Sequence, residues 1–196
     1  MSRIKSLCVY CGSSTGADPA YRAAAEAMGT LLAREGITLV FGVGKVGLMG
    51  IVADAALRAG GRVHGVIPHA LSGKEVLHPG LSEVEVVGSM HERKARMAEL
   101  SDAFVALPGG LGTYEELFET WTWAQLGWHA KPVAILNVAG FYDRLVGFLG
   151  HVVDQGFVQE THRAMLLVDE DPGKLLDRLR AYVPPETPKW LGPDEN

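Results

Sequence analysis

Leu107-Pro108-Gly109-Gly110-Leu111-Gly112-Thr113-Tyr114-Glu115-Glu116 is the stretch of this sequence that decides the fold. The segment 102–106 before it is short and mostly apolar, which is typical of a buried strand. After it, Phe118, Trp121 and Trp128 recur near helical spacing, so a helix is expected to follow. The stretch 107–116 is therefore predicted to be a Gly-rich turn that joins a strand to a helix.

A turn of this kind exposes backbone N–H groups where the helix dipole adds partial positive charge. Gly109, Gly110 and Gly112 lack a Cβ atom, so an anion can approach the backbone closely. We expect the anion to be a phosphate, with Glu116 in the first helical turn facing the reacting part of the ligand. The alternative is a capping box from Thr113 to Glu116, in which both side chains only satisfy helix-end donors.

Composition points to an ordinary globular protein. The chain has 196 residues, 47% of them hydrophobic and 21% charged, which suits one domain. A net charge of −5 without a long Lys/Arg cluster argues against a nucleic-acid partner. No apolar run is long enough to cross a membrane and no signal peptide is evident, so we expect a cytoplasmic protein. We predict a nucleotide-binding domain over 1–183 and a Pro-rich tail over 184–196.

Strands and helices are predicted to alternate along the chain. Such alternation predicts an α/β fold, a Rossmann-like doubly wound parallel sheet with helices on both faces in a single domain. Ligands bind such sheets at the carboxyl ends of the strands, so the loops there should form the site. The predicted strands are 4–10, 37–41, 62–67, 83–87, 102–106, 133–136 and 165–168, and the predicted helices include 20–34, 48–57, 89–100, 141–153 and 172–182.

Two further motifs lie at this predicted edge of the sheet. Gly42–Gly47 matches G-x-G-x-x-G, but the next strand ends at 66–68 without the acidic residue that NAD binding requires, so hydride transfer is disfavoured. This loop either lines a nucleotide site or is a purely structural turn. Arg93 and Lys94, early in a helix, either form a solvated face or point at a phosphate or ribose.

Other candidate groups carry weaker signals. Cys8 and Cys11 have C-x-x-C spacing, but Cys8 lies in an apolar run, which favours reduced strand-end thiols over a redox pair. The histidines lack the spacing of a metal site, and none is predicted. The apolar stripe on the helix after the Gly-rich turn is expected to form core or a subunit interface; it comprises Tyr114, Phe118, Trp121 and Trp128.

The motifs together resemble the LOG ("lonely guy") family, the cytokinin riboside 5′-monophosphate phosphoribohydrolases. The family motif P-G-G-x-G-T-x-x-E is complete from Pro108 to Glu116, and the resemblance runs from about residue 5 to about residue 170. One departure is Val43, where the family usually has consecutive glycines. The other matching blocks are Cys11-Gly12-Ser13-Ser14, Gly47-Leu48-Met49-Gly50, Met90-His91-Glu92-Arg93-Lys94 with Met97, Trp121-Thr122-Trp123-Ala124-Gln125-Leu126-Gly127, Lys131-Pro132-Val133 and Gly156-Phe157.

The resemblance implies an enzyme that hydrolyses the N-glycosidic bond of AMP or N6-substituted AMP, such as N6-isopentenyl-AMP, without a cofactor. The products would be the free base and ribose 5-phosphate, and the family's habit implies a homodimer. Members have also been labelled lysine decarboxylases, but the sequence singles out no pyridoxal-binding lysine. The rival hypothesis is a non-catalytic nucleotide or molybdenum-cofactor carrier.

The resemblance also implies roles for individual residues. Arg93 and Glu116 correspond to the catalytic pair, and the run Gly110–Thr113 corresponds to the phosphate site. The complete set of expected substrate-binding residues is Glu75, Lys94, Gly109, Gly110, Leu111, Gly112, Thr113, Tyr114, Glu115 and Thr122.

Overall fold

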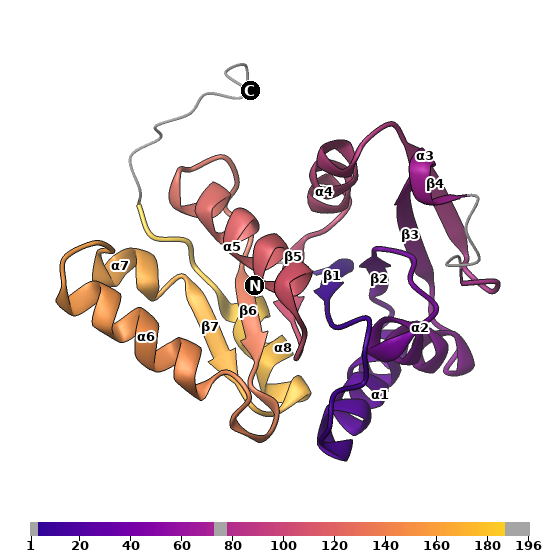
Figure 1. Ribbon diagram of the computed structural model, residues 1–196, viewed down its shortest axis with the longest axis horizontal. Helices are drawn as coiled ribbons and strands as arrows, with labels where there is room; N and C mark the ends of the chain where they lie inside the picture. Colours follow the sequence, from indigo (N-terminus) through magenta and orange to yellow (C-terminus); the bar gives the residue numbers. More distant parts are fainter. Residues whose placement is uncertain (1–3, 73–77, 187–196) are drawn as a thin grey trace.

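The computed structural model describes residues 4–72 and 78–186, and within them seven strands form one parallel sheet. The order across the sheet is β4-β3-β2-β1-β5-β6-β7 (Figure 1), which confirms the predicted doubly wound, Rossmann-like fold. The strands are β1 Ser6–Tyr10, β2 Thr38–Phe41, β3 Val63–Pro68, β4 Glu83–Val87, β5 Ala103–Ala106, β6 Val133–Leu136 and β7 Leu166–Asp169.

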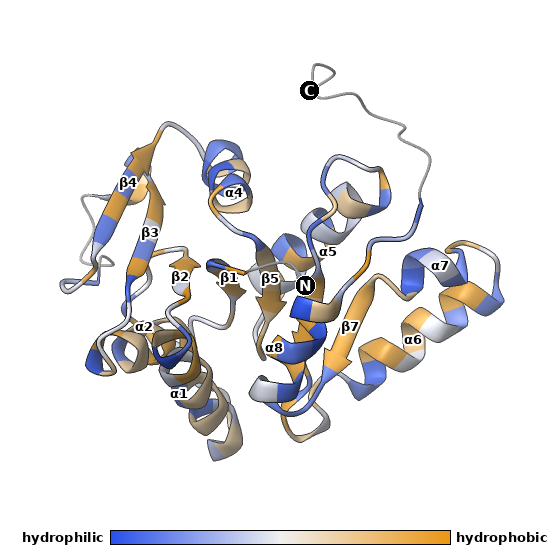
Figure 2. Cartoon of the chain, turned by 180° about the vertical axis from the view of Figure 1, so that it is seen from behind, coloured by the Kyte–Doolittle hydropathy of each residue, from blue (hydrophilic) through white to orange (hydrophobic). Residues whose placement is uncertain are grey.

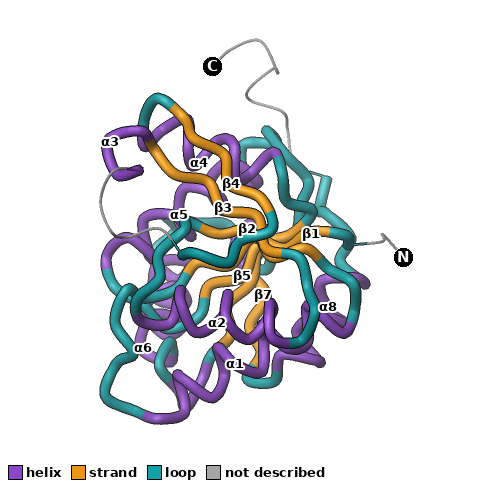
Figure 3. Tube along the Cα trace, turned by 90° about the vertical axis from the view of Figure 1, so that its right-hand side faces the viewer, coloured by secondary structure: helices purple, strands orange, loops and turns teal. Residues whose placement is uncertain are grey.

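Helices connect the strands and cover both faces of the sheet. They are α1 Pro19–Arg34, α2 Gly47–Arg58, α3 His69–Ser72, α4 Met90–Glu99, α5 Leu111–Gln125, the 3-10 helix η1 Val138–Gly140, α6 Asp143–Asp154, α7 Glu160–Arg163 and α8 Pro172–Ala181. Figure 3 shows the strands between α1 and α2 on one side and α4 on the other.

The alternation of side chains along β1 explains the two layers. Leu7 and Val9 point into a core that they share with α1, α2 and α8. Cys8 and Tyr10 point into a second core, with α4, α5 and α6. Because a central parallel strand is buried on both faces, its sequence is apolar throughout. Figure 2 shows the hydrophobic colour concentrated on the strands and mixed with hydrophilic residues on helices such as α6.

Helix starts follow the local sequence, with some differences from the prediction. Asp18 caps α1 by accepting from the N–H of Ala20 at 2.8 Å, as the Asp-Pro pattern predicts. The helix predicted over 141–153 instead begins at Asp143, after η1, where Ala139 has a φ of +50°. Helix α7 was not predicted, since four residues are too few to show a helical period.

Three of the four residues predicted as an apolar stripe on α5 belong to the core, whereas the fourth, Trp128, lies beyond the end of the helix at Gln125. Trp121 is 6% exposed, and Tyr114 and Phe118 pack against the same cluster. The indole N–H of Trp121 donates to the backbone oxygen of His162 at 3.0 Å. Of the two roles expected for this stripe, the structure therefore supports the core.

Candidate active site

The site lies where the chain reverses its direction across the sheet. Strand β1 lies between β2 and β5, so the connections after β1 and β5 leave toward opposite edges of the sheet. A crevice at such a point is the usual ligand site of doubly wound folds. Gly12, which follows β1, donates its N–H to the carbonyl of Pro108, which follows β5, at 3.0 Å. The two loops that border the crevice are thus joined directly.

The glycine motif Gly42–Gly47 leads into a helix whose first amides already bond to the loop after β1. The carbonyl of Gly12 accepts from the N–H groups of Leu48 at 3.0 Å and Met49 at 3.4 Å, near the start of α2. Gly47 has a φ of +61°, and a Cβ atom there would lie 2.2 Å from the backbone carbon of Ser13. The amides of Leu48 and Met49, which follow the motif at the start of α2, already have partners, so the geometry favours the structural turn over a phosphate loop at Gly42–Gly47.

The start of α5 is open by comparison. Gly110 is the N-cap residue and provides no side-chain cap, so among the described residues no side-chain cap satisfies the first amides of the helix. A Cβ atom built on Gly110 or Gly112 would have no atom within 4 Å, apart from neighbouring and helical backbone. Leu111 is 88% exposed. Unfilled N–H groups and the helix dipole therefore face open space, as an anion site requires.

The predicted capping box from Thr113 to Glu116 does not form. The helix begins at Leu111, two residues before Thr113, and the hydroxyl of the buried Thr113 lies against Gly109. Glu116 is consequently in the second turn of α5, about 6 Å along the axis from Gly112 at 1.5 Å per residue. The expectation that Glu116 occupies the first turn was wrong, because Gly110 rather than Thr113 caps the helix.

Arg93 on α4 and Glu116 on α5 form an ion pair across the crevice. Nη2 of Arg93 donates to Oε1 of Glu116 at 3.2 Å, and the side chains are 11% and 13% exposed. Burial raises the pKa of Glu116 above its ordinary value, while the charge of Arg93 opposes that rise. Nε of Arg93 is buried and has no hydrogen-bond partner among the described residues. The pair is partly dehydrated, which strengthens its electrostatic effect on a ligand.

Two side-chain hydrogen bonds hold the start of α4, the helix that carries Arg93. Ser89 Oγ accepts from the N–H of Glu92 at 3.1 Å, and Glu92 Oε2 accepts from the N–H of Gly88 at 2.7 Å. This arrangement starts α4 at Met90, three residues before Arg93, as the sequence predicts. The start of α4 is therefore held independently of the Arg93–Glu116 pair.

The thiols of Cys8 and Cys11 are coupled electrostatically to Glu116. Cys8 and Cys11 are buried and free, and burial raises the pKa of each thiol well above its ordinary range. The Glu116 carboxylate adds to both shifts. The thiols therefore stay protonated, as expected for reduced strand-end cysteines rather than a redox pair.

Lys94 and Tyr114, two other expected binding residues, make contacts within the protein. Lys94 is 8% exposed and pairs with Glu115 and, at 3.0 Å, with Glu119, so its charge is committed to α5. Tyr114 packs edge-on against Tyr142, with ring centroids 6.0 Å apart.

The structure does not place the last two expected binding residues, Thr122 and Glu75, at the crevice. Thr122 is exposed on α5, about 15 Å along the helix axis from Gly112. Glu75 lies outside the described residues. Within one chain, the predicted residues that meet at the crevice are thus Gly109–Thr113, Arg93 and Glu116.

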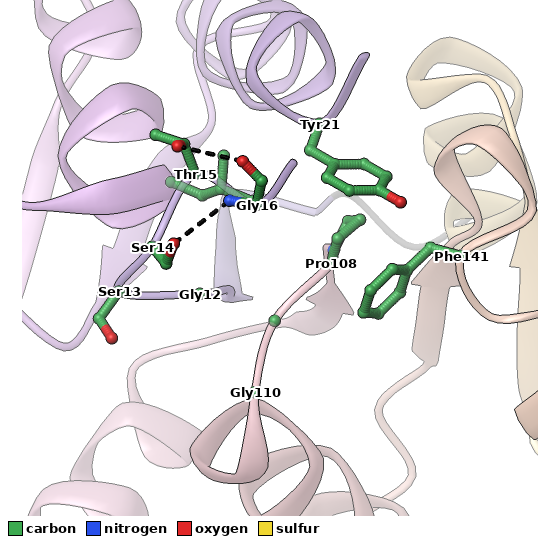
Figure 4. A pocket seen from close by; sticks show the side chains of 11 residues that line it. Gly12, Ser13, Ser14, Thr15, Gly16, Tyr21, Pro108, Gly110 and Phe141 are labelled. Atoms are coloured by element: carbon green, nitrogen blue, oxygen red, sulfur yellow. Dashed lines mark hydrogen bonds between the residues drawn. The ribbon is translucent and has the colours of Figure 1, made fainter. Parts of the chain in front are cut away.

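A cavity of about 290 Å³ borders the α5 N-cap. Figure 4 shows Tyr21 and Phe141 together on one side and Ser13 and Ser14 on the other. The rings of Tyr21 and Phe141 meet edge-on with centroids 5.5 Å apart.

The cavity extends the crevice to one side of the ion pair. Its lining includes Gly109 and Gly110, whereas Arg93 and Glu116 are not among the described residues that line it. The sequence marks Gly12, Ser13 and Ser14 as part of a block that resembles the family, but nothing in it marks Tyr21 or Phe141. Their contributions depend on how α1 and the segment after η1 pack together, and no local motif marks them.

The described residues contain neither a metal-binding cluster nor a membrane-spanning helix. Nowhere in 4–72 and 78–186 do three or more His, Cys, Asp or Glu side chains gather as a metal site would require. In the same part of the chain, no helix has both the length and the apolar character needed to cross a membrane.

Sequence comparisons match most of this chain to one family of proteins. Residues 49–179 match a family model described as "Possible lysine decarboxylase". The chain is 52% identical over 183 residues to the probable cytokinin riboside 5′-monophosphate phosphoribohydrolase LOGL9 of Oryza sativa subsp. japonica, covering 93% of this chain and 81% of that protein. It is 46% identical to the cytokinin riboside 5′-monophosphate phosphoribohydrolase LOG1 of Arabidopsis thaliana, covering 93% and 86%.

Solved structures show a more distant likeness. The molybdenum cofactor binding protein of Rippkaea orientalis superimposes with a TM-score of 0.69 at 22% identity, covering 92% of this chain and 98% of that one. The molybdenum cofactor carrier protein of Chlamydomonas reinhardtii gives a TM-score of 0.67 at 21% identity, covering 92% and 100%. At this identity the likeness concerns the fold alone. The extensive sequence matches, in contrast, show that the chain belongs to the LOG family of cytokinin riboside 5′-monophosphate phosphoribohydrolases.

Proposed function

We propose that this protein hydrolyses the N-glycosidic bond of adenosine 5′-monophosphates, including N6-substituted ones, to the free base and ribose 5-phosphate. The observation that carries the proposal is the partly buried Arg93–Glu116 pair, which lies one helical turn beyond the open N-terminus of α5. The names of relatives 46–52% identical to this chain support the same reaction. A carrier needs no such pair of charges beside its anion site.

In the proposed complex, the 5′-phosphate is held by backbone N–H groups of the run Gly110–Thr113. Support comes from the absence of a side-chain cap and from the open space at Gly110 and Gly112. The helix dipole favours a dianion there without a nearby cation. The ribose then extends along α5 toward Glu116, which is about one turn away.

Glu116 is proposed as the catalytic carboxylate. Breaking the bond between C1′ and the base nitrogen develops positive charge on the sugar, and a carboxylate beside C1′ stabilises it. The C1′–N bond breaks, and the oxygen of a water molecule bonds to C1′. The proton that this water loses balances the proton that the departing base nitrogen gains. Arg93 holds Glu116 in place and opposes the rise that burial causes in its pKa, which favours the ionised carboxylate.

The assay for this proposal is incubation with AMP or N6-isopentenyl-AMP, followed by chromatography for the free base. We expect Glu116→Gln to abolish base release while nucleotide binding persists, because the amide keeps the shape but not the charge. Glu119→Gln is the matched control, since Glu119 is on the same helix but pairs with Lys94. Binding of both nucleotides without base release by the wild-type protein would contradict the enzyme and favour the carrier.

We also propose that the protein is a homodimer, as the resemblance implies. Tyr114, Phe118 and Trp121 pack toward the core, whereas large aromatic side chains are exposed elsewhere on the chain. Phe148 on α6 is 60% exposed and Phe157 is 85% exposed, and aromatic side chains of this kind are enriched at interfaces. Sedimentation at micromolar concentration should give twice the 21.0 kDa mass of one chain. A single-chain mass at that concentration would contradict the dimer.

A further inference from the structure

Gly42 follows β2 and lies directly against the guanidinium group of Arg93. A Cβ atom built on Gly42 would lie 1.8 Å from Nη2, 2.8 Å from Cζ and 3.2 Å from Nε of Arg93. Nη2 is the nitrogen that donates to Glu116 Oε1. A single methyl group at position 42 would therefore occupy the space of the nitrogen that makes the ion pair.

Backbone conformation does not explain a glycine at this position. Gly47 in the same loop has a positive φ, whereas Gly42 does not, so alanine could adopt the backbone angles of Gly42 without strain. Space is what position 42 lacks. The crowded atoms are the end of a flexible side chain, so an added methyl group should displace the guanidinium rather than the backbone.

We propose that Gly42 is a positioning residue for the reaction: its missing side chain lets the guanidinium of Arg93 lie over the loop after β2 and reach Glu116. The inference rests on the proposed function, in which Glu116 faces the sugar. Gly42 touches no reacting atom in this account and acts only through Arg93.

Gly44 provides a matched control in the same loop. A Cβ atom there would lie 2.4 Å from Met49 Cε, again the end of a flexible side chain, and its three nearest atoms all belong to Met49. The φ of Gly44 is not positive either. Gly44→Ala is therefore the same chemical change with similar crowding, but away from Arg93.

The first measurement compares AMP cleavage by the wild type, Gly42→Ala and Gly44→Ala, with melting temperatures for all three. We expect Gly42→Ala to fold and to lose about 100-fold in kcat, the scale of a catalytic group misplaced by about 1 Å. KM should change little, because the phosphate is held by α5. Gly44→Ala should keep the wild-type kcat. A Gly42→Ala protein that is fully active, or that unfolds while Gly44→Ala folds, would overturn the proposal.

A double-mutant cycle tests whether Gly42 acts through Arg93. Arg93→Ala removes the guanidinium that a methyl group at position 42 would displace. Adding Gly42→Ala to Arg93→Ala should therefore cause no further loss of kcat, because the two effects are not additive. An equal loss from Gly42→Ala in both backgrounds would overturn the proposal, since it would show a role independent of Arg93.

A last readout does not depend on catalysis. Arg93 lowers the pKa of Glu116, so displacing the guanidinium should raise that pKa in Gly42→Ala but not in Gly44→Ala. Carboxyl NMR titration of Glu116 measures this difference directly. An unchanged pKa in Gly42→Ala would overturn the inference even if the wild type cleaves AMP. An inactive wild type with the expected pKa shift would instead contradict only the proposed function.

Discussion

At the scale of single residues, two buried groups show how surroundings set protonation. Glu116 has a raised pKa because it is buried, and Arg93 limits the rise by pairing with it. His129 lies outside the crevice and is also shielded from water, and its pKa is lowered to about 4. Burial is the main cause of both shifts, because it disfavours the charged form of either group.

His129 makes the stability of the protein depend on pH. Its Nε2 lies 3.1 Å from the carbonyl of Thr120, and its Nδ1 accepts from the N–H of Lys131 at 3.2 Å. A neutral ring satisfies both contacts, whereas a protonated Nδ1 would face another donor. Since the folded-state pKa is below the unfolded value of 6.5, this stabilisation is complete above pH 6.5 and is lost as pH falls toward about 4.

We expect the wild-type free energy of unfolding to fall by at most roughly 3 kcal/mol from this group across that range. His129→Gln should flatten the dependence, and urea unfolding at a series of pH values measures it. His151→Gln, on the exposed side of α6, is the matched control and should leave the dependence unchanged. An equal fall in wild type and His129→Gln would exclude His129 as the cause.

The sequence predicts those residues of the candidate site that lie together in a short motif. It does not predict residues that meet only through tertiary packing. Gly109–Thr113 and Glu116 lie in one short motif, and their surroundings follow from the strand and helix on either side. The contact of Gly42 with Arg93 was not predictable, because it depends on one side-chain conformation across two loops. The same holds for Tyr21 and Phe141, which meet only through tertiary packing.

At the scale of elements, two helices begin after Gly-rich loops at the same edge of the sheet, yet only one start is open. Early amides of α2 bond to the carbonyl of Gly12, while those of α5 have no side-chain cap. The two motifs look alike in sequence, and only the path of the loop after β1 separates them. The difference explains why the phosphate is assigned to α5.

The open start of α5 predicts opposite effects on stability and on binding. Gly112→Asp should raise the melting temperature, because an acid in the first turn adds about 0.3–1 kcal/mol and glycine is a poor helix former. The same charge should repel a phosphate and weaken AMP binding by roughly tenfold, or ~1.4 kcal/mol.

Gly112→Asn is the control for size, because it is neutral and nearly isosteric with the Asp variant. Calorimetric titration with AMP should show the Asp variant binding more weakly than the Asn variant, with the difference shrinking as salt is added. Equal affinities for the two variants would place the phosphate away from α5.

The order of elements was the more predictable part of the fold. Alternation of apolar strands with helical patterns predicts the parallel sheet, and the helices predicted over 20–34 and 89–100 begin within one residue of the observed starts, where Asp18 and Ser89 are the N-caps. The capping box places the N-cap of α5 at Thr113, three residues after the observed N-cap Gly110, because a glycine N-cap has no side-chain signature. Helix α7 escaped prediction because it is a single short turn.

At the scale of the whole molecule, the doubly wound order brings distant segments to one crevice. Loops that follow β1 and β5 are about a hundred residues apart in sequence, yet Gly12 and Pro108 share a hydrogen bond. The sheet therefore determines where a ligand binds, and the loops determine which ligand. Thr122 remains far from the phosphate site within one chain, so its expected role requires either a long substrate or a second subunit.

The most direct measurement of the central claim is a crystal structure of Glu116→Gln with AMP bound. The account predicts phosphate oxygens within hydrogen-bond distance of the backbone N–H groups of Gly110–Thr113, and C1′ of the ribose beside the side chain at position 116. AMP bound with its phosphate elsewhere, or with C1′ directed away from position 116, would contradict it.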